Sequence, residues 1–183
     1  MKSVLISIQP KWVEKIANGK KTIEVRKTRP KIETPFKCYI YCTKGKYDLF
    51  WLDEEIKDTD GLPKGLRAYN SRLGNGSVVG EFTCDKIDEF HEWELTHSKK
   101  FFELEQNRLN NFLKKSCLTY EEICNYRKNL PYYKPLYGWH ITDLKIYDKP
   151  RELSEFKQEI VKGAMPKKLI RPPQSWFYIE VGE

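Results

Sequence analysis

The chain has 183 residues, of which 33 are Lys or Arg and 26 are Asp or Glu, so its net charge is +7. An apolar content of 39% with 14% aromatics is enough for a packed core and excludes wholesale disorder. No apolar run is long enough to span a bilayer, and polar residues return soon after Val4-Leu5-Ile6. We therefore expect a cytoplasmic protein without a membrane segment or a signal peptide.

The first elements follow one another closely along the chain. Residues 3–8 predict a strand, with Val4, Ile6 and Ile8 on one face. Residues 10–18 carry apolar side chains at helical spacing, and Pro10 suits the first turn because its missing N–H has no partner there. Gly19 then fits the left-handed position that ends a helix. Residues 22–26 alternate strictly and predict a second strand.

The second predicted strand carries a compact group of polar side chains. Its alternation places Thr22, Glu24 and Arg26 on one face. Lys20 and Lys21 directly precede this strand, so a carboxylate and several cations come from one rigid segment. Two or more cations around one carboxylate leave unbalanced positive charge, which favours an anionic ligand.

The remaining pattern predicts one α+β domain over residues 1–183. A basic loop with two prolines, residues 28–35, precedes further strands. The strand-like hydrophobic pattern weakens over residues 44–75, which we expect to be an insertion that folds over the barrel. A second, helical insertion follows, and its second helix begins with a capping box made by Thr119 and Glu122. The expected segments are the loop 28–35, strands 37–43, 76–90, 137–147 and 175–181, helices 98–114 and from 119, and insertions 44–75 and 95–135.

The cysteines give no sign of a metal site. Their number, five, is odd, and their spacing contains no C-x-x-C pair. Cys38 and Cys42 would share one face of a strand, which is typical of buried thiols. The three histidines do not complete a ligand set with them. We expect a reduced protein with no metal and no cofactor.

The excess positive charge is concentrated near the N-terminus. Residues 11–46 contain 11 Lys and Arg but 3 Asp and Glu, a net charge of +8, so the rest of the chain carries −1. A basic segment of this kind attracts phosphates, as nucleic-acid-binding surfaces do.

The motif residues Gly19, Lys21, Glu24 and Arg26 resemble the G-x-K-x-x-E-x-R signature of the ASCH family within the PUA-like superfamily. Residues 76–82 and 139–180 are similar, more loosely, to phage-type members. The resemblance implies a distorted β-barrel, a mixed sheet of about five to seven strands, with helices at its openings. In such a fold the polar face of the motif strand points into a cleft.

The resemblance implies an RNA- or nucleotide-binding module that holds a base, modified or not, and a phosphate in a basic cleft. The expected partner is RNA, a nucleotide or a modified nucleoside. Arg26 would grip a phosphate, with Lys20 or Lys21 adding charge, and Glu24 would accept hydrogen bonds from the base. Candidates for further contacts to the ligand are Thr22, Trp139, His140 and Trp176, and Trp12 and Tyr178 are additional stacking candidates.

Hydrolysis is the alternative function. One family branch resembles an amidohydrolase acting on N4-acetylcytidine, which implies Lys21 as base, but Glu24 stands where that branch has its threonine nucleophile. Glu24 would then activate water, or Thr22 would be a displaced nucleophile. Candidate second acids are Glu81, Glu121 and Glu122. A ribonuclease would use Lys21, Glu24 and Arg26, with His140 as acid.

Two further interpretations stay open at the level of sequence. The motif side chains would form a partly buried salt bridge with a purely structural role. The chain would alternatively be a protein-interaction module that responds to no nucleotide.

Overall fold

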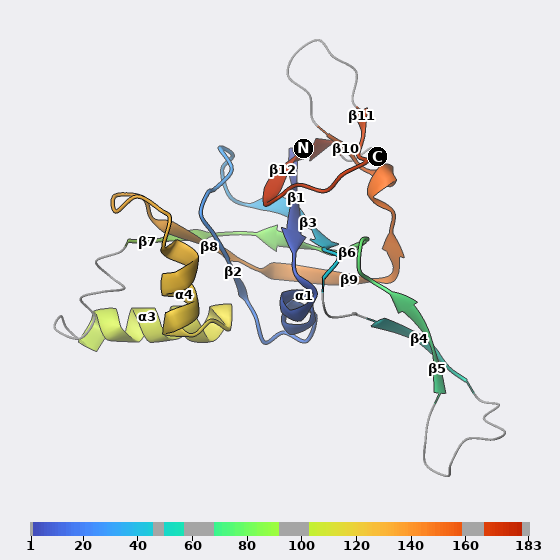
Figure 1. Cartoon of the computed structure of the whole chain (residues 1–183), viewed down its shortest axis with the longest axis horizontal. Helices are drawn as coiled ribbons and strands as arrows, with labels where there is room; N and C mark the ends of the chain where they lie inside the picture. The colour runs from blue at the N-terminus through green and yellow to red at the C-terminus, as the bar shows by residue number, and fades with distance from the viewer. Residues whose placement is uncertain (1, 46–49, 57–67, 92–102, 159–166, 181–183) are drawn as a thin grey trace.

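The computed structural model describes residues 2–45, 50–56, 68–91, 103–158 and 167–180. A seven-stranded sheet with the order β11-β10-β12-β1-β3-β6-β9 forms its centre, and a three-stranded sheet with the order β2-β8-β7 stands beside it (Figure 1). The large sheet contains β1 (Ser3–Ile8), β3 (Phe36–Cys42), β6 (Val78–Cys84), β9 (Thr142–Arg151), β10 (Lys157–Gln158), β11 (Lys167–Lys168) and β12 (Trp176–Glu180). The small sheet contains β2 (Ile23–Arg26), β7 (Ile87–Phe90) and β8 (Leu136–His140).

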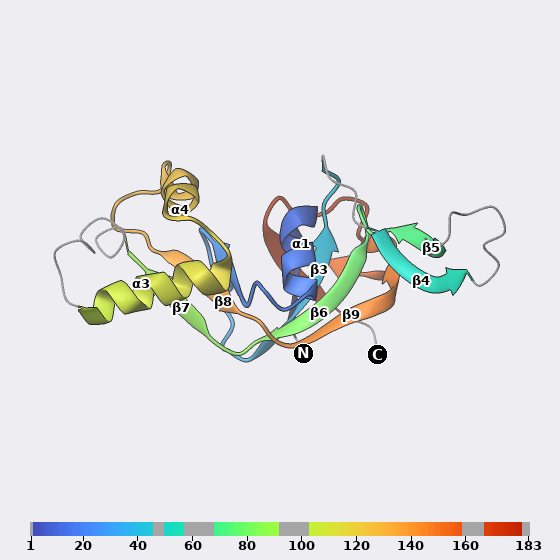
Figure 2. The same cartoon turned by 90° about the horizontal axis from the view of Figure 1, so that it is seen from below.

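Two antiparallel strand pairs connect the sheets. β6 pairs with β9 in the large sheet, and the chain segments that continue from them, β7 and β8, pair in the small sheet. Figure 2 shows these two segments running side by side and curving from one sheet into the other. Asp143, at the start of β9, has a φ of 47° at this bend. The small sheet is therefore a bent continuation of the large one.

The predicted α+β class is confirmed, whereas the predicted distorted barrel is not, because the sheet is not closed. Among the described strands the large sheet has two edges, β11 and β9. The motif strand β2 hydrogen-bonds to β8 instead of to β1, because the β8–β9 segment bends away from the large sheet at residue 141. The sheets are thus open, and their concave side holds a helix.

That helix is α1 (Pro10–Ala17), which begins at the predicted proline and packs Val13 and Ile16 into the main core. The main core also contains the alternate β1 side chains Val4, Ile6 and Ile8. The inserted helices α3 (Glu103–Ser116) and α4 (Tyr120–Arg127) cover the small sheet through a separate apolar cluster. The predicted capping box of Thr119 and Glu122 is present at the start of α4.

The first insertion contains an antiparallel strand pair, β4 (Phe50–Ile56) and β5 (Ala68–Leu73). This pair extends away from the large sheet (Figure 1), so the described part of the insertion does not fold over the barrel strands as expected. A short 3₁₀ turn, η1 (Leu153–Glu155), follows β9. Parts of the two predicted insertions and the start of the helix expected at residue 98 lie outside the described residues. Within the described ranges, no helix combines the length and apolarity that crossing a membrane requires.

Candidate functional site

The motif is held in place by backbone contacts on both sides. Gly19 ends α1 with a φ of 72°, as predicted, and its N–H donates to the Ile16 carbonyl at 2.9 Å. The Thr22 N–H donates to the Lys115 carbonyl at 2.9 Å. The start of the motif strand is therefore attached to the end of the inserted helix α3, and the insertion helps to position the motif.

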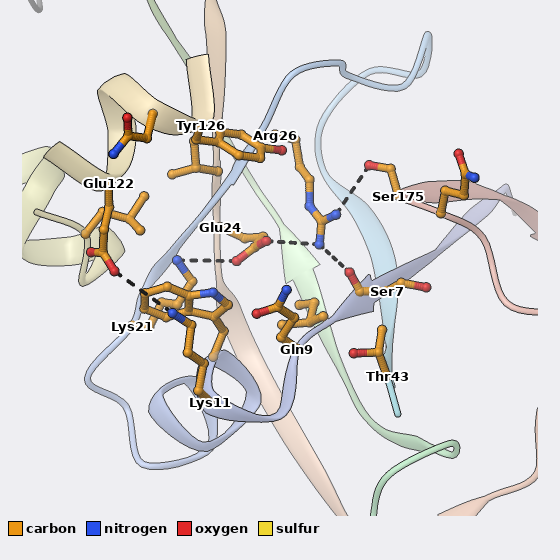
Figure 3. A pocket seen from close by; sticks show the side chains of 16 residues that line it. Ser7, Gln9, Lys11, Lys21, Glu24, Arg26, Thr43, Glu122, Tyr126 and Ser175 are labelled. Atoms are coloured by element: carbon orange, nitrogen blue, oxygen red, sulfur yellow. Dashed lines mark hydrogen bonds and ion pairs between the residues drawn. The ribbon is translucent and has the colours of Figure 1, made fainter. Parts of the chain in front are cut away.

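Glu24 lies between two cations at the centre of the site. Its Oε2 is 3.3 Å from the Lys21 Nζ, and its Oε1 is 3.0 Å from the Arg26 Nη2 (Figure 3). All three side chains are at least nine-tenths buried. The Lys21 Nζ also donates to the Ser116 carbonyl at 2.7 Å. Because each oxygen of the carboxylate has a cationic partner, the position of the Glu24 side chain is fixed from both sides.

Arg26 joins the motif strand to two other segments. Its Nη2 donates to the Ser7 carbonyl at 2.6 Å, and its Nη1 donates to the Ser175 Oγ at 3.3 Å. Its Nε is buried and has no acceptor among the described residues. The guanidinium is thus mostly occupied by protein partners, which leaves less of it for the predicted grip on a phosphate.

These side chains form the floor of a pocket of about 610 Å³. The pocket lies between the end of β1, helix α1, the motif strand, helix α4 and the segment before β12. The lining residues are Ser7, Ile8, Gln9, Lys11, Trp12, Lys21, Glu24, Val25, Arg26, Thr43, Leu118, Glu122, Asn125, Tyr126, Gln174 and Ser175. One wall therefore comes from β1, α1 and the motif strand, and the other comes from the inserted helix α4.

Cations surround the aromatic side chains of the pocket. Three lysine ammonium groups lie over the Trp12 ring, with Lys11 at 4.3 Å, Lys15 at 4.8 Å and Lys21 at 5.0 Å from its centroid. On the opposite wall, the Lys27 Nζ lies 4.9 Å from the Tyr126 ring centroid.

Acidic groups reduce this positive charge without cancelling it. Lys11 pairs with Glu122 at 4.0 Å across the mouth of the pocket. Burial raises the pKa of Tyr126, which keeps its hydroxyl protonated. Three lining cations, Lys11, Lys21 and Arg26, face two lining carboxylates, so the lining has a net charge of +1.

The structure brings together five of the predicted residues in one pocket: Lys21, Glu24 and Arg26, the stacking candidate Trp12 and the candidate acid Glu122. Lys20 and Thr22 are their neighbours in sequence but are not among the lining residues. The Lys20 side chain is exposed, and the Thr22 carbonyl accepts from the Ile141 N–H. Neither residue lines the pocket, although both were predicted to contact the ligand.

Trp139 was predicted to contact a ligand, and the structure contradicts this. The residue is completely buried in the main core, where its ring packs edge-on against Phe36 at 5.7 Å. A base cannot stack on a ring whose surroundings are already filled. Trp176 is partly buried and donates from Nε1 to the Thr28 Oγ1 at 3.0 Å, outside the pocket lining.

His140 also lies away from the pocket. It pairs in register with Ile23, next to the Glu24–Trp139 pair, and cross-strand partners point to the same face of a sheet. His140 therefore faces away from Glu24, and its Nε2 lies 2.7 Å from the Asp88 Oδ2. The ribonuclease arrangement with His140 as acid beside Glu24 is not assembled in this structure.

The candidate second acids are dispersed as well. Glu81 lies on β6, where it pairs with Lys37 at 2.8 Å and accepts from the Tyr147 hydroxyl. Glu121 is exposed on α4 and is not a lining residue. Glu122 lines the pocket, and it also makes the cap of α4 with Thr119.

Sequence reasoning missed the other polar lining side chains. Ser7 lies near the end of β1 and Gln9 is the N-cap of α1. Asn125 and Tyr126 lie on the inserted helix α4, and Ser175 precedes the last strand. These residues are up to 168 positions apart in the sequence, so no local pattern relates them. The basic charge of residues 11–46 was a usable signal for Lys11, which lies in that range.

The α+β fold agrees with the comparisons with known proteins. The family model for the ASCH domain matches residues 6–151, and the chain therefore belongs to the ASCH family. ASCH domains have a PUA-like fold and are generally thought to bind RNA. None of the curated proteins compared with the sequence matches it.

Solved structures of the ASCH protein from Zymomonas mobilis are similar in fold. A serine-to-alanine variant of that protein has a TM-score of 0.56 at 15% identity, over 97% of this chain and 88% of the other. A tyrosine-to-phenylalanine variant has a TM-score of 0.52 at 15% identity, over 98% and 91% of the two chains. Identity at this level establishes a shared fold only.

Proposed function

We propose that this ASCH protein binds one nucleotide unit of RNA in the pocket, with the base on the floor and the phosphate at the rim. The observation that carries the proposal is the position of Glu24. Its carboxylate lies on the floor of a pocket whose walls contain the aromatic residues Trp12 and Tyr126. A planar ligand with N–H donors on its edge and negative charge on its tail matches these groups.

Glu24 supplies the hydrogen-bond acceptor for the base. An ionised carboxylate accepts and does not donate, and each of its oxygens has more than one lone pair. Lys21 and Arg26 each occupy one lone pair of the Glu24 carboxylate. A ring N–H or an exocyclic amine of the base can donate to another lone pair. Gln9 and Asn125 line the same pocket and offer both donors and acceptors to the rest of the base edge.

The phosphate is best placed near the lysines of the rim. Lys11, Lys15 and Lys27 lie over pocket aromatics, and Lys11 is half-exposed. A lysine binds phosphate as a point charge and does not need a fixed geometry. Arg26 instead orients Glu24, so it acts as a positioning residue and not as the main phosphate ligand.

The same contacts argue against a purely structural salt bridge. Burying ions is expensive, and buried pairs often add no net stability compared with apolar residues. Here one carboxylate has two buried cations, and the Arg26 Nε has no acceptor among the described residues. Such a set is poorly suited to stability alone, because a buried unsatisfied donor costs about 1–3 kcal/mol.

Hydrolysis remains the alternative, with Lys21 and Glu24 as its catalytic residues. A lysine acting as base must first lose a proton, but the Lys21 ammonium donates to the Ser116 carbonyl and pairs with Glu24. The Lys21 side chain is therefore already occupied by two protein partners. This arrangement supports binding over Lys21-based hydrolysis, and product analysis separates the two.

The test is thermal unfolding with a panel of nucleosides, nucleoside monophosphates, modified cytidines and short RNAs, followed by product analysis of each mixture. A ligand present at one hundred times its Kd should raise Tm by about 5–10 °C. A shift without product supports binding, and product formation supports the hydrolase. No shift with any member of the panel contradicts the proposal.

Two variants make the test specific to the pocket. Glu24→Gln keeps the side-chain shape and should weaken binding about ten-fold or more, because a hydrogen bond to a charged acceptor is lost. Glu81→Gln is the matched control, since Glu81 is also a lysine-paired carboxylate but lies outside the pocket. Equal binding losses in both variants would contradict the role of Glu24.

A further inference from the structure

Two adjacent tyrosines beyond the pocket are unusually exposed. Tyr132 is 64% exposed and Tyr133 is 72% exposed. Both lie in the connection between α4 and β8, which arches outward from the end of α4 (Figure 1). The pocket residue Tyr126 is on the last turn of the same helix. Large aromatic side chains that are exposed just after a helix that lines a binding pocket offer surface for stacking.

The connection that carries these tyrosines is held by a buried arginine. Arg127 donates to the carbonyls of Pro131 at 3.2 Å, Tyr132 at 2.9 Å and Lys134 at 2.6 Å. The Lys134 N–H also donates to the Pro131 carbonyl at 3.0 Å. The backbone is thus fixed at the point where the side chains are exposed, so little conformational entropy remains to be lost when a ligand binds.

The charge of this region suits a polyanion. Residues 123–142 contain no Asp or Glu, whereas they contain Arg127, Lys128 and Lys134. Lys128 and Lys134 are exposed. A further cation, Lys27, lies over the ring of Tyr126 at the end of α4.

From these observations we infer that residues 126–134 form a second subsite, which binds the part of a single-stranded RNA that continues beyond the pocket. This inference rests on the proposed function and specifies its ligand as a polymer. Bases of the continuing strand stack on Tyr132 and Tyr133, and Lys128 and Lys134 contact its phosphates. Stacking on tyrosine tolerates any base, so this subsite adds affinity and not sequence selectivity.

The experiment compares two ligands by equilibrium binding: the nucleoside monophosphate with the largest thermal shift, and a single-stranded RNA octamer containing that base. The Tyr132→Ala/Tyr133→Ala double variant should weaken octamer binding by about five-fold to one hundred-fold for each stacked base, without changing monophosphate binding. Tyr132→Phe/Tyr133→Phe keeps the rings and should bind the octamer like the wild type. Ile170→Ala, at a residue 87% exposed outside the pocket lining, controls for truncating an exposed apolar side chain.

The salt dependence supplies an independent readout. Lys134→Ala should reduce the slope of log K against log salt by about 0.7 for the octamer, the value for one phosphate contact on a single strand. The slope for the monophosphate should stay the same. All the substituted side chains are exposed, so the variants should unfold at the wild-type temperature.

The outcomes separate the two proposals. If the octamer binds no more tightly than the monophosphate, or if the double alanine variant binds it normally, the second subsite is refuted while the pocket function stands. If Glu24→Gln binds both ligands normally, the pocket function fails, and with it the inference that rests on it. Loss of octamer binding alone in the tyrosine variant, together with loss of both ligands in Glu24→Gln, supports both.

Discussion

Glu24 and Arg26 are two positions apart on β2 and form a 3.0 Å ion pair on its pocket-facing side. Residues at i and i+2 of a strand share a face, but an extended backbone separates them by about 6–7 Å. The pair is therefore closed by the long arginine side chain, which also reaches the Ser7 carbonyl on β1. This relationship ties the small sheet to the large one at the floor of the pocket.

Removing Arg26 should accordingly reduce stability as well as ligand binding. We expect Arg26→Ala to lower the free energy of unfolding by about 3–5 kcal/mol, because Glu24 loses one of its two buried cationic partners. Urea unfolding measures the change. Arg29→Ala is the control, since Arg29 pairs with Glu89 at the surface and should change stability by less than about 1 kcal/mol. Similar losses of unfolding free energy in both variants would contradict the expectation that the buried ion pair contributes more than the surface pair.

Asp88 should contribute stability that depends on pH. Burial opposes ionisation, but hydrogen bonds from Lys86 and His140 outweigh it and hold the pKa of Asp88 below its usual value of 3.8. The unfolded chain therefore binds a proton at higher pH than the folded protein, and the stabilisation is present above pH 3.8 and lost as pH falls through the folded pKa. Asp88→Asn should be less stable than wild type at pH 6, and the difference should shrink below about pH 4. Denaturant unfolding at several pH values tests this, and a constant difference would contradict it.

The cysteines should divide into two groups by reactivity. Burial raises the pKa of Cys42 and of Cys84 to about 12, and it raises the pKa of Cys38 well above its usual value. Because the thiolate is the reactive form, these thiols should resist a thiol reagent at pH 8 in the native protein. Cys117 and Cys124 are partly exposed and should react. Mass spectrometry should find at most two modified cysteines in the native state and five after denaturation. Rapid modification of Cys38 in the native protein would contradict its place among the unreactive thiols.

Gly80 is required where β6 passes β9. A Cβ at this position would lie 2.6 Å from the Lys145 carbonyl oxygen, which belongs to the backbone and cannot move cheaply. Gly80→Ala should lower the free energy of unfolding by about 1–3 kcal/mol through overpacking. Gly45→Ala is the control, because its Cβ would meet only the Pro10 side chain at 3.4 Å. A small effect at both positions would show that the two strands can move apart.

Local sequence determined the elements that depend on neighbouring residues. The helix that starts at Pro10, the left-handed Gly19 after it and the capping box at Thr119 were all predicted correctly. Each depends on steric or hydrogen-bonding preferences within a few residues, which are the same in any fold. The charged group of Lys21, Glu24 and Arg26 was found for the same reason.

Tertiary structure decided which other side chains share the pocket. The pocket includes Ser7 from β1, Tyr126 from the inserted helix α4 and Ser175 from the segment before β12. Only the packing of these segments brings the three residues together. It also decided that Trp139 fills the core and that His140 faces Asp88. Periodicity in a sequence states which side chains share a face, but it does not state what that face meets. The open sheet and the composition of the pocket depend on these contacts between residues that are distant in the sequence.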